Sequence, residues 1–199
     1  MDPELLGWPP DGPKLRLDYE RFSYAGKFVM SNTGKAVVRP GPNDGIQGEA
    51  ADTASEGEAA DTASEGDGYD AVLAAAAFNE DRTDAATLWI RYITVRGDRR
   101  GEGIGPDLAD FVAERAAARG YERVRIAVNN PFAYEALYKA GFGYTGETTG
   151  IAELVLERPG DRSAARYRDG MAEFRGRENL SDAERAFVAE SREPPDGAD

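Results

Sequence analysis

The chain has 199 residues and a net charge of −13, from 37 acidic and 24 basic residues, which suits one domain of ordinary size with tails. It contains neither cysteine nor histidine, which excludes disulfides, a cysteine nucleophile, the Ser-His-Asp triad and nearly every zinc site. Proton transfer must therefore use carboxylates, tyrosines, lysines, the amino terminus or water. No basic stripe exists to neutralise phosphates, which argues against nucleic acid as a partner.

The excess of acidic residues has two interpretations. One is a surface that receives basic partners such as polyamines or histone-like tails. The other is adaptation to a salt-filled cytoplasm, where the Debye length falls to ~3 Å near 1 M salt. The chain has only four lysines, and lysine depletion together with acid enrichment favours an extreme halophile. Neither a signal peptide nor a membrane span is indicated, so we expect a cytoplasmic protein.

Along the chain, residues 1–13 are expected to form an N-terminal tail. Strands are predicted from Lys14 to Glu20 and from Lys35 to Arg39, with Lys27 to Met30 as a third candidate. The segment 49–57 is then repeated without change as 58–66. Its acidic and small residues bury too little apolar area to offset the entropy of ordering. We therefore expect a disordered insertion at about 40–67, as a duplication in a surface loop or as a docking segment.

The remaining chain alternates strand and helix signals. The predicted order is a strand at 71–78, a turn, a strand at 87–95, a helix at 106–119, a strand at 124–128, a helix from Pro131 to Gly141 capped by Asn130, and a closing hairpin at 142–144 and 151–156. This order predicts an α/β domain with a mixed sheet over 14–158. The segment 159–199 is expected to be a helical extension with a disordered end, packed on the domain or on a second subunit of a homodimer.

The segment Arg100-Gly-Glu-Gly-Ile-Gly105 lies directly between a predicted strand and a predicted helix. Glycines there let consecutive backbone N–H groups turn toward one point, and the helix N-terminus adds a partial positive charge. Such a nest suits a diphosphate. The dinucleotide fingerprint would need glycine where Pro106 stands, and the Gly-Lys-Ser/Thr of a P-loop is missing. The remaining alternative is an ordinary glycine-rich turn.

From Val95 to Gly105 the sequence resembles the coenzyme A pyrophosphate loop of GNAT acetyltransferases. A helix and a strand follow, and then Asn130, Ala133, Gly141 and Phe142 match a second segment of that family. The resemblance covers roughly 72–155. It implies a GNAT-like, mostly antiparallel mixed sheet with a splayed strand pair and flanking helices, and an acyltransferase that uses acetyl-CoA and no metal. The acceptor would be a primary amine on a small molecule or a protein, and no membrane is implied.

The resemblance also implies roles for individual residues. The amides of Arg100, Gly101, Glu102, Gly103, Ile104 and Gly105 would hold the pyrophosphate. Ile93, Thr94 and Val95 would lie beside the pantetheine, and Asn130 would line the same arm. Relatives often carry a general-base carboxylate on the strand before the loop, which this chain lacks; transfer of the amine proton to water is therefore expected.

The catalytic tyrosine of many relatives corresponds to Leu137, which is a departure from the family pattern. Tyr138 is one residue later and Tyr134 is about one turn earlier. Either is a candidate acid for the departing thiolate, with Tyr138 favoured, and either could instead be an aromatic packed between helix and sheet. Because of Leu137, a non-catalytic acyl-CoA-binding module remains the alternative function.

Overall fold

The computed structural model describes residues 1–41 and 71–195. Seven strands form one sheet in the order β1-β2-β3-β4-β5-β7-β6. The strands are β1 (Pro3–Gly7), β2 (Gly34–Val38), β3 (Ala74–Glu80), β4 (Thr87–Val95), β5 (Arg123–Val128), β6 (Gly143–Thr149) and β7 (Glu153–Arg158). Every neighbouring pair is antiparallel except β4 and β5. The predicted mixed, mostly antiparallel sheet is confirmed.

The parallel pair β4–β5 is joined along only part of its length. Pairing runs from Thr87 opposite Arg123 to Ile90 opposite Ile126 and goes no further. At the same level the register of β3 and β4 shifts, so that Phe78 pairs with Ile90 while the preceding Ala77 pairs with Tyr92. A bulge of this kind bends and twists a strand. The bulge at Arg91 thus turns the second half of β4 away from β5, and the predicted splayed pair is confirmed.

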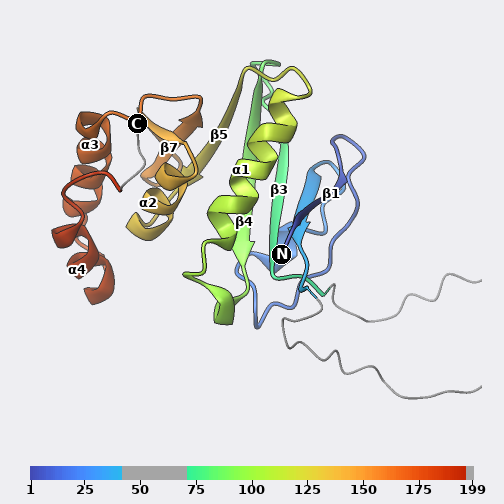
Figure 1. Cartoon of the computed structure of the whole chain (residues 1–199), viewed down its shortest axis with the longest axis horizontal. Coiled ribbons are helices and arrows are strands. Elements are labelled where there is room, and N and C mark those ends of the chain that lie inside the picture. The colour runs from blue at the N-terminus through green and yellow to red at the C-terminus, as the bar shows by residue number, and fades with distance from the viewer. Residues whose placement is uncertain (42–70, 196–199) are drawn as a thin grey trace, which may run out of the picture.

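Four α-helices flank the sheet: α1 (Ile104–Ala117), α2 (Pro131–Lys139), α3 (Ala164–Arg175) and α4 (Asp182–Glu190). Helix α1 lies across β3 and β4, while α3 and α4 lie together beyond α2 (Figure 1). One apolar core joins these helices to one face of the sheet, through residues such as Ile90, Leu108 and Met171. The helix α1 starts two residues before the predicted Pro106, which its first turn tolerates because those amides have no partner within the helix.

The opposite face of β2 and β3 is covered by the N-terminal segment 14–28 rather than by an α-helix. Leu15, Leu17, Phe22 and Phe28 pack there against sheet residues such as Ala75. The strands predicted at 14–20 and 27–30 are wrong. The alternation of Leu15 and Leu17 reflects burial against this face, and 25–27 forms a single 3-10 turn, η1 (Ala25–Lys27).

The two ends of the chain also differ from expectation. Residues 3–7, expected in a tail, form the edge strand β1, antiparallel to β2. The segment after residue 158 contains α3 and α4, and α4 begins with a capping box in which Ser181 and Glu184 bind each other's backbone amides. The predicted insertion lies outside the described residues except at 40 and 41, as does the end of the tail at 196–199. Within the described ranges, no helix combines the length and hydropathy that a membrane span requires.

Candidate active site

The segment 100–105, predicted to be a phosphate cradle, forms a chain reversal between β4 and α1. Arg100 is extended, whereas Gly101 and Gly103 have φ angles of 87° and 82°. These left-handed conformations strain any residue with a Cβ, which explains glycine at both positions. Gly103 is the N-cap of α1. A Cβ on Gly105 would lie 3.3 Å from Val95 Cγ2, so this glycine lets the helix start close to the end of β4.

The backbone amides of this turn are available to a ligand. Among the described residues, none accepts a hydrogen bond from the N–H groups of Gly101, Gly103, Ile104 or Gly105. Intrahelical bonding begins only with Asp107 N–H, which donates to Gly103 C=O at 3.2 Å. Unpaired amides and the positive end of a helix dipole together favour an anion. The residues present therefore fit the pyrophosphate of coenzyme A.

Two arginines near the turn have structural partners. Arg100 donates from Nη2 to Ser23 Oγ at 2.9 Å, which ties the N-terminal segment to the cradle. Arg96, only 8% exposed, forms two hydrogen bonds with the Asp98 carboxylate, and these lower the pKa of Asp98. The contact to Ser23 had no signal in the sequence, because the two residues lie 77 positions apart.

Beyond the bulge, β4 presents an edge without a strand partner on the β5 side. Ile93, Thr94 and Val95 pair with β3 only. The Thr94 hydroxyl is buried and has no hydrogen-bond partner within the described chain. A buried polar atom in this condition carries an uncompensated desolvation cost. An open strand edge with a free hydroxyl can bind an extended chain of amides such as pantetheine.

Asn130 is the N-cap of α2. Its Oδ1 accepts a hydrogen bond from Ala133 N–H at 2.8 Å and so caps α2. Its side-chain amide donates to Asn129 Oδ1 at 3.2 Å. The cap was anticipated from the sequence together with Pro131 at the first helical position. With both side-chain groups engaged in the turn, Asn130 fixes where α2 begins beside the open end of β5.

Both candidate acids, Tyr134 and Tyr138, are fully buried at 0% exposure. The Tyr134 hydroxyl donates to the backbone carbonyl oxygen of Tyr167, at 3.2 Å, and the Tyr138 hydroxyl to that of Ser163, at 3.1 Å. Burial raises the pKa of Tyr138 to about 12 and that of Tyr134 further still. Both hydroxyls are thus directed at α3, and the proposed acid role has no support in this geometry.

The Leu137 side chain, at the position where many relatives carry the tyrosine, is also in the core at 3% exposure. The rings of Tyr134 and Tyr138 lie 5.6 and 5.0 Å from that of Tyr167 on α3. An aromatic cluster of this kind stabilises packing through area and edge contacts. The C-terminal extension, rather than a substrate, is therefore the neighbour of both tyrosines.

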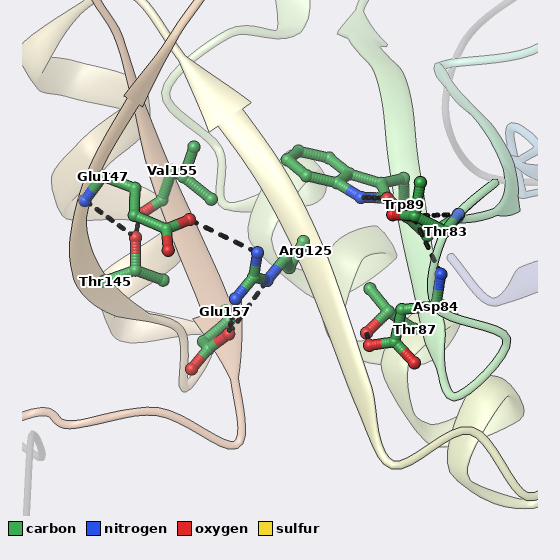
Figure 2. Close-up of polar contacts among 10 residues, drawn as sticks. Thr83, Asp84, Thr87, Trp89, Arg125, Thr145, Glu147, Val155 and Glu157 are labelled. Atoms are coloured by element: carbon green, nitrogen blue, oxygen red, sulfur yellow. Dashed lines mark hydrogen bonds and ion pairs between the residues drawn. The ribbon is translucent and has the colours of Figure 1, made fainter.

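The turn acids near β4 are engaged as well. Asp81 accepts hydrogen bonds from Thr83, from Asp84 N–H and from Trp89 Nε1, the last at 2.5 Å. These bonds, led by those from Thr83, lower the pKa of Asp81 to about 2. Figure 2 shows Trp89 turned toward this loop, with Thr87 bound to Asp84. A carboxylate so strongly stabilised in its charged form is a weak base.

On β5 and β7, the strands beyond Trp89 in the sheet, further polar side chains pair with one another. Trp89 is the register neighbour of Arg125, which in turn is opposite Glu157. The Arg125 guanidinium is turned toward Glu147 and Glu157 and forms ion pairs with both at 3.3 and 3.0 Å (Figure 2). Arg91, at the bulge, donates to Asn79 Oδ1 at 2.7 Å. The strand β4 itself contains no carboxylate.

One protein-family model matches the part of the chain that contains this site. The model of the acetyltransferase (GNAT) family matches residues 49–144, which include the cradle, β4, β5 and α2. This match supports the resemblance noted in the sequence. No curated protein sequence matches the chain significantly.

Solved structures with a similar chain path include an N-acetyltransferase from Staphylococcus aureus Mu50 (18% identity, TM-score 0.43), a GCN5-related N-acetyltransferase from Kribbella flavida (25%, 0.39) and the PaiA N-acetyltransferase from Thermoplasma acidophilum in complex with coenzyme A (17%, 0.37). The alignments cover 63%, 45% and 43% of this chain and 66%, 61% and 52% of those chains. This chain thus spans less than two thirds of each. Because the TM-scores are low, the proposal below rests on the residues of this chain and on the family match.

Proposed function

We propose that this chain is an acyl-CoA-dependent N-acetyltransferase of the GNAT family, which moves the acetyl group of acetyl-CoA to a primary amine by direct attack in a ternary complex. The observation that carries the proposal is the pairing of two features at one end of β4. The free amides of Gly101, Gly103 and Ile104 lie at the start of α1, and the half of β4 that leads to them, from the bulge at Arg91 to Val95, has no partner on the β5 side. An anion site next to an open strand edge suits a diphosphate with an extended amide arm.

The chain promotes the reaction mainly by holding acetyl-CoA and the acceptor amine next to each other. The amides from Arg100 to Gly105 hold the pyrophosphate, and the edge from Ile93 to Val95 binds the pantetheine amides. The thioester supplies the acetyl group, and the acceptor nitrogen attacks its carbonyl carbon. Holding two reactants in register supplies ~7–11 kcal/mol by itself, so turnover does not require a strong acid. The amine proton passes to water, and the buried Tyr134 and Tyr138 keep a structural role.

The acceptor class is a primary amine of a small molecule or of a protein. No metal is assigned; among the described residues, no group of three or more carboxylates converges on one point. Because the chain is rich in acidic residues and poor in lysine, we also propose that it works in a cytoplasm of high salt, where repulsion between surface carboxylates is screened. Binding and turnover are therefore to be measured at both low and molar salt.

Two measurements test the function. Titration calorimetry with acetyl-CoA is expected to show one site per chain, and the absence of binding at every salt concentration would refute the proposal. Release of free thiol from acetyl-CoA over a panel of amines is then expected to rise above the rate without protein. Binding without thiol release for any amine would instead support a non-catalytic acyl-CoA-binding module.

A further inference from the structure

The side chain of Lys27 lies against the splayed half of β4. Lys27 ends the turn η1, and its Nζ is 5.9 Å from the centroid of the Tyr92 ring. An ammonium group over an aromatic face within about 6 Å is attracted by the ring. Tyr24 lies on the same ring, with a centroid distance of 6.0 Å. Tyr92 therefore already holds a primary amine, which belongs to the chain itself.

Tyr92 lies in the splayed half of β4, on the edge where the proposed pantetheine arm would bind. It is the first residue after the bulge at Arg91 and belongs to the part of β4 that has no partner on the β5 side. A strand rises about 3.3 Å per residue, so Tyr92 is about 10 Å along the strand from Val95, the last residue of β4 before the turn that leads to the cradle. This is the direction in which a pantetheine arm bound on the strand edge would carry its thioester.

The segment that carries Lys27 is fastened to the cradle. Gly97 N–H donates to Arg21 C=O at 2.9 Å, and Arg100 donates to Ser23 Oγ at 2.9 Å. Tyr24, between these contacts and Lys27, has a left-handed φ of 60°. Such a conformation in a non-glycine residue is uncommon and is often found at functional sites. The amine is thus held near the splay by bonds to the phosphate turn itself.

The other three lysines differ from Lys27 in their surroundings. Lys139 pairs with Glu135 at 2.7 Å. Lys35 is completely buried, and its Nζ donates to Met30 C=O and to Thr33. Lys14 is exposed but has no ring contact with β4. Lys27 is exposed, and no carboxylate among the described residues pairs with it, so its amine is available for reaction.

We propose that Lys27 is an internal acetylation site of this chain. The proposal rests on the proposed function, since the donor is acetyl-CoA bound at the cradle and on the β4 edge. The neutral Lys27 Nζ attacks the thioester carbonyl carbon, a C–N bond forms and the C–S bond breaks. The proton lost by the nitrogen balances the thiolate, and free coenzyme A leaves as the thiol.

Acetylation of Lys27 changes the charge beside the Tyr92 ring, where an external amine would also bind. The product amide is neutral, so it loses the attraction of an ammonium group to the Tyr92 ring. The free lysine competes for this ring with a cationic acceptor, whereas the acetylated lysine does not. Modification of Lys27 therefore raises the affinity of the site for an external amine.

The test uses the full chain, acetyl-CoA and peptide mass spectrometry that quantifies acetylation at each lysine. Because the reaction is intramolecular, Lys27 is expected to be acetylated at least about tenfold faster than Lys14, with a rate constant independent of protein concentration. Acetyl phosphate, which does not carry the coenzyme A moiety, serves as the matched control donor and is expected to remove the preference for Lys27. The Lys27→Arg variant removes the site and is expected to leave acetyl-CoA binding unchanged.

The possible outcomes distinguish acetylation of Lys27 from the proposed acetyltransferase function. If acetyl-CoA does not bind, both are refuted. If acetyl-CoA binds, or supports transfer to an added amine, while Lys27 reacts no faster than Lys14, the internal site alone is refuted. Equal preference for Lys27 with acetyl phosphate would also overturn it, because the preference would then reflect exposure rather than the bound donor.

Discussion

The ring of Tyr134 on α2 fills the space that a side chain at Gly170 on α3 would need. A Cβ built on Gly170 would collide with the Tyr134 hydroxyl and ring carbons. The two helices can approach this closely only because position 170 has no side chain, and the approach brings the Tyr134 hydroxyl to the carbonyl oxygen of Tyr167. The C-terminal extension therefore packs directly against Tyr134 and Tyr138, the two residues predicted from the sequence as candidate acids.

Gly170→Ala is therefore expected to destabilise the protein, although alanine is the better helix former by about 1 kcal/mol. The collision with Tyr134 forces a shift in a packed core, which costs roughly 1–3 kcal/mol. Chemical denaturation measures the change in the free energy of unfolding. Gly176→Ala, at the C-cap of the same helix and with only ordinary contacts, is the control and is expected to change little. A stabilised Gly170→Ala protein would show that α3 does not pack as described.

Tyr134→Phe and Tyr138→Phe are each expected to keep thiol-release activity while lowering the free energy of unfolding by about 1 kcal/mol. Each substitution removes one hydrogen bond to a backbone carbonyl, that of Tyr167 in α3 or that of its N-cap Ser163, which keeps the helical bond from Tyr167 N–H. Steady-state kinetics and denaturation on the same samples check both parts. A large loss of kcat in a variant of normal stability would restore the acid role predicted from the sequence.

Gly103→Ala is expected to weaken acetyl-CoA binding by about tenfold, because alanine resists the left-handed φ that aims the cradle amides. Gly120 provides a matched control, since its φ is 88° and it too has no neighbour within 4 Å of a built Cβ. Gly120→Ala is expected to cost similar stability, roughly 1–2 kcal/mol, with unchanged affinity in calorimetry. Equal affinity loss in both variants would mean that the effect is general destabilisation.

Thr94→Val is expected to leave the unliganded protein as stable or more stable, because it removes a buried hydroxyl that has no partner. If the ligand binds that hydroxyl, affinity for acetyl-CoA falls by roughly fivefold, the equivalent of about 1 kcal/mol. Thr87→Val is the control on the same strand. Its hydroxyl donates to Asp84 at 2.7 Å, so this variant is expected to lose stability and keep affinity. Unchanged affinity in Thr94→Val would exclude Thr94 from the site.

The free energy of unfolding is expected to pass through a maximum near pH 10. Burial lowers the pKa of Lys35 from 10.5 to about 8, so between these values the unfolded chain binds more protons and stability rises with pH. Burial raises the pKa of Tyr138 from 10.0 to about 12, so its contribution is complete below pH 10 and is lost as pH rises toward 12. Denaturation from pH 8 to 11.5 measures both limbs. Tyr138→Phe is expected to reduce the fall in the free energy of unfolding above pH 10, and Lys35→Met is expected to reduce its rise between pH 8 and 10. If either variant keeps the slope of the original protein, that residue does not cause the pH dependence.

The local features of this protein could be predicted from its sequence. The glycines at 101 and 103, the cap at Asn130 and the alternating strand at Val124, Ile126 and Val128 all depend on backbone conformation or on neighbours a few residues away. These rules located the glycine-rich turn at 100–105 and the order of β3 to β7. They also identified the missing base on β4.

The partners of side chains far apart in the sequence were decided only by the tertiary structure. Leu15 and Leu17 alternate as a strand would, but they cover a sheet face, and Pro3–Gly7 pairs with β2 in their place. Tyr134 and Tyr138 lie in the sequence near the position of the family's catalytic tyrosine, but their hydroxyls donate hydrogen bonds to the carbonyl oxygens of Tyr167 and Ser163. Lys27 and Tyr92 meet for the same reason. Such contacts follow from the packing of whole elements, which no local pattern encodes.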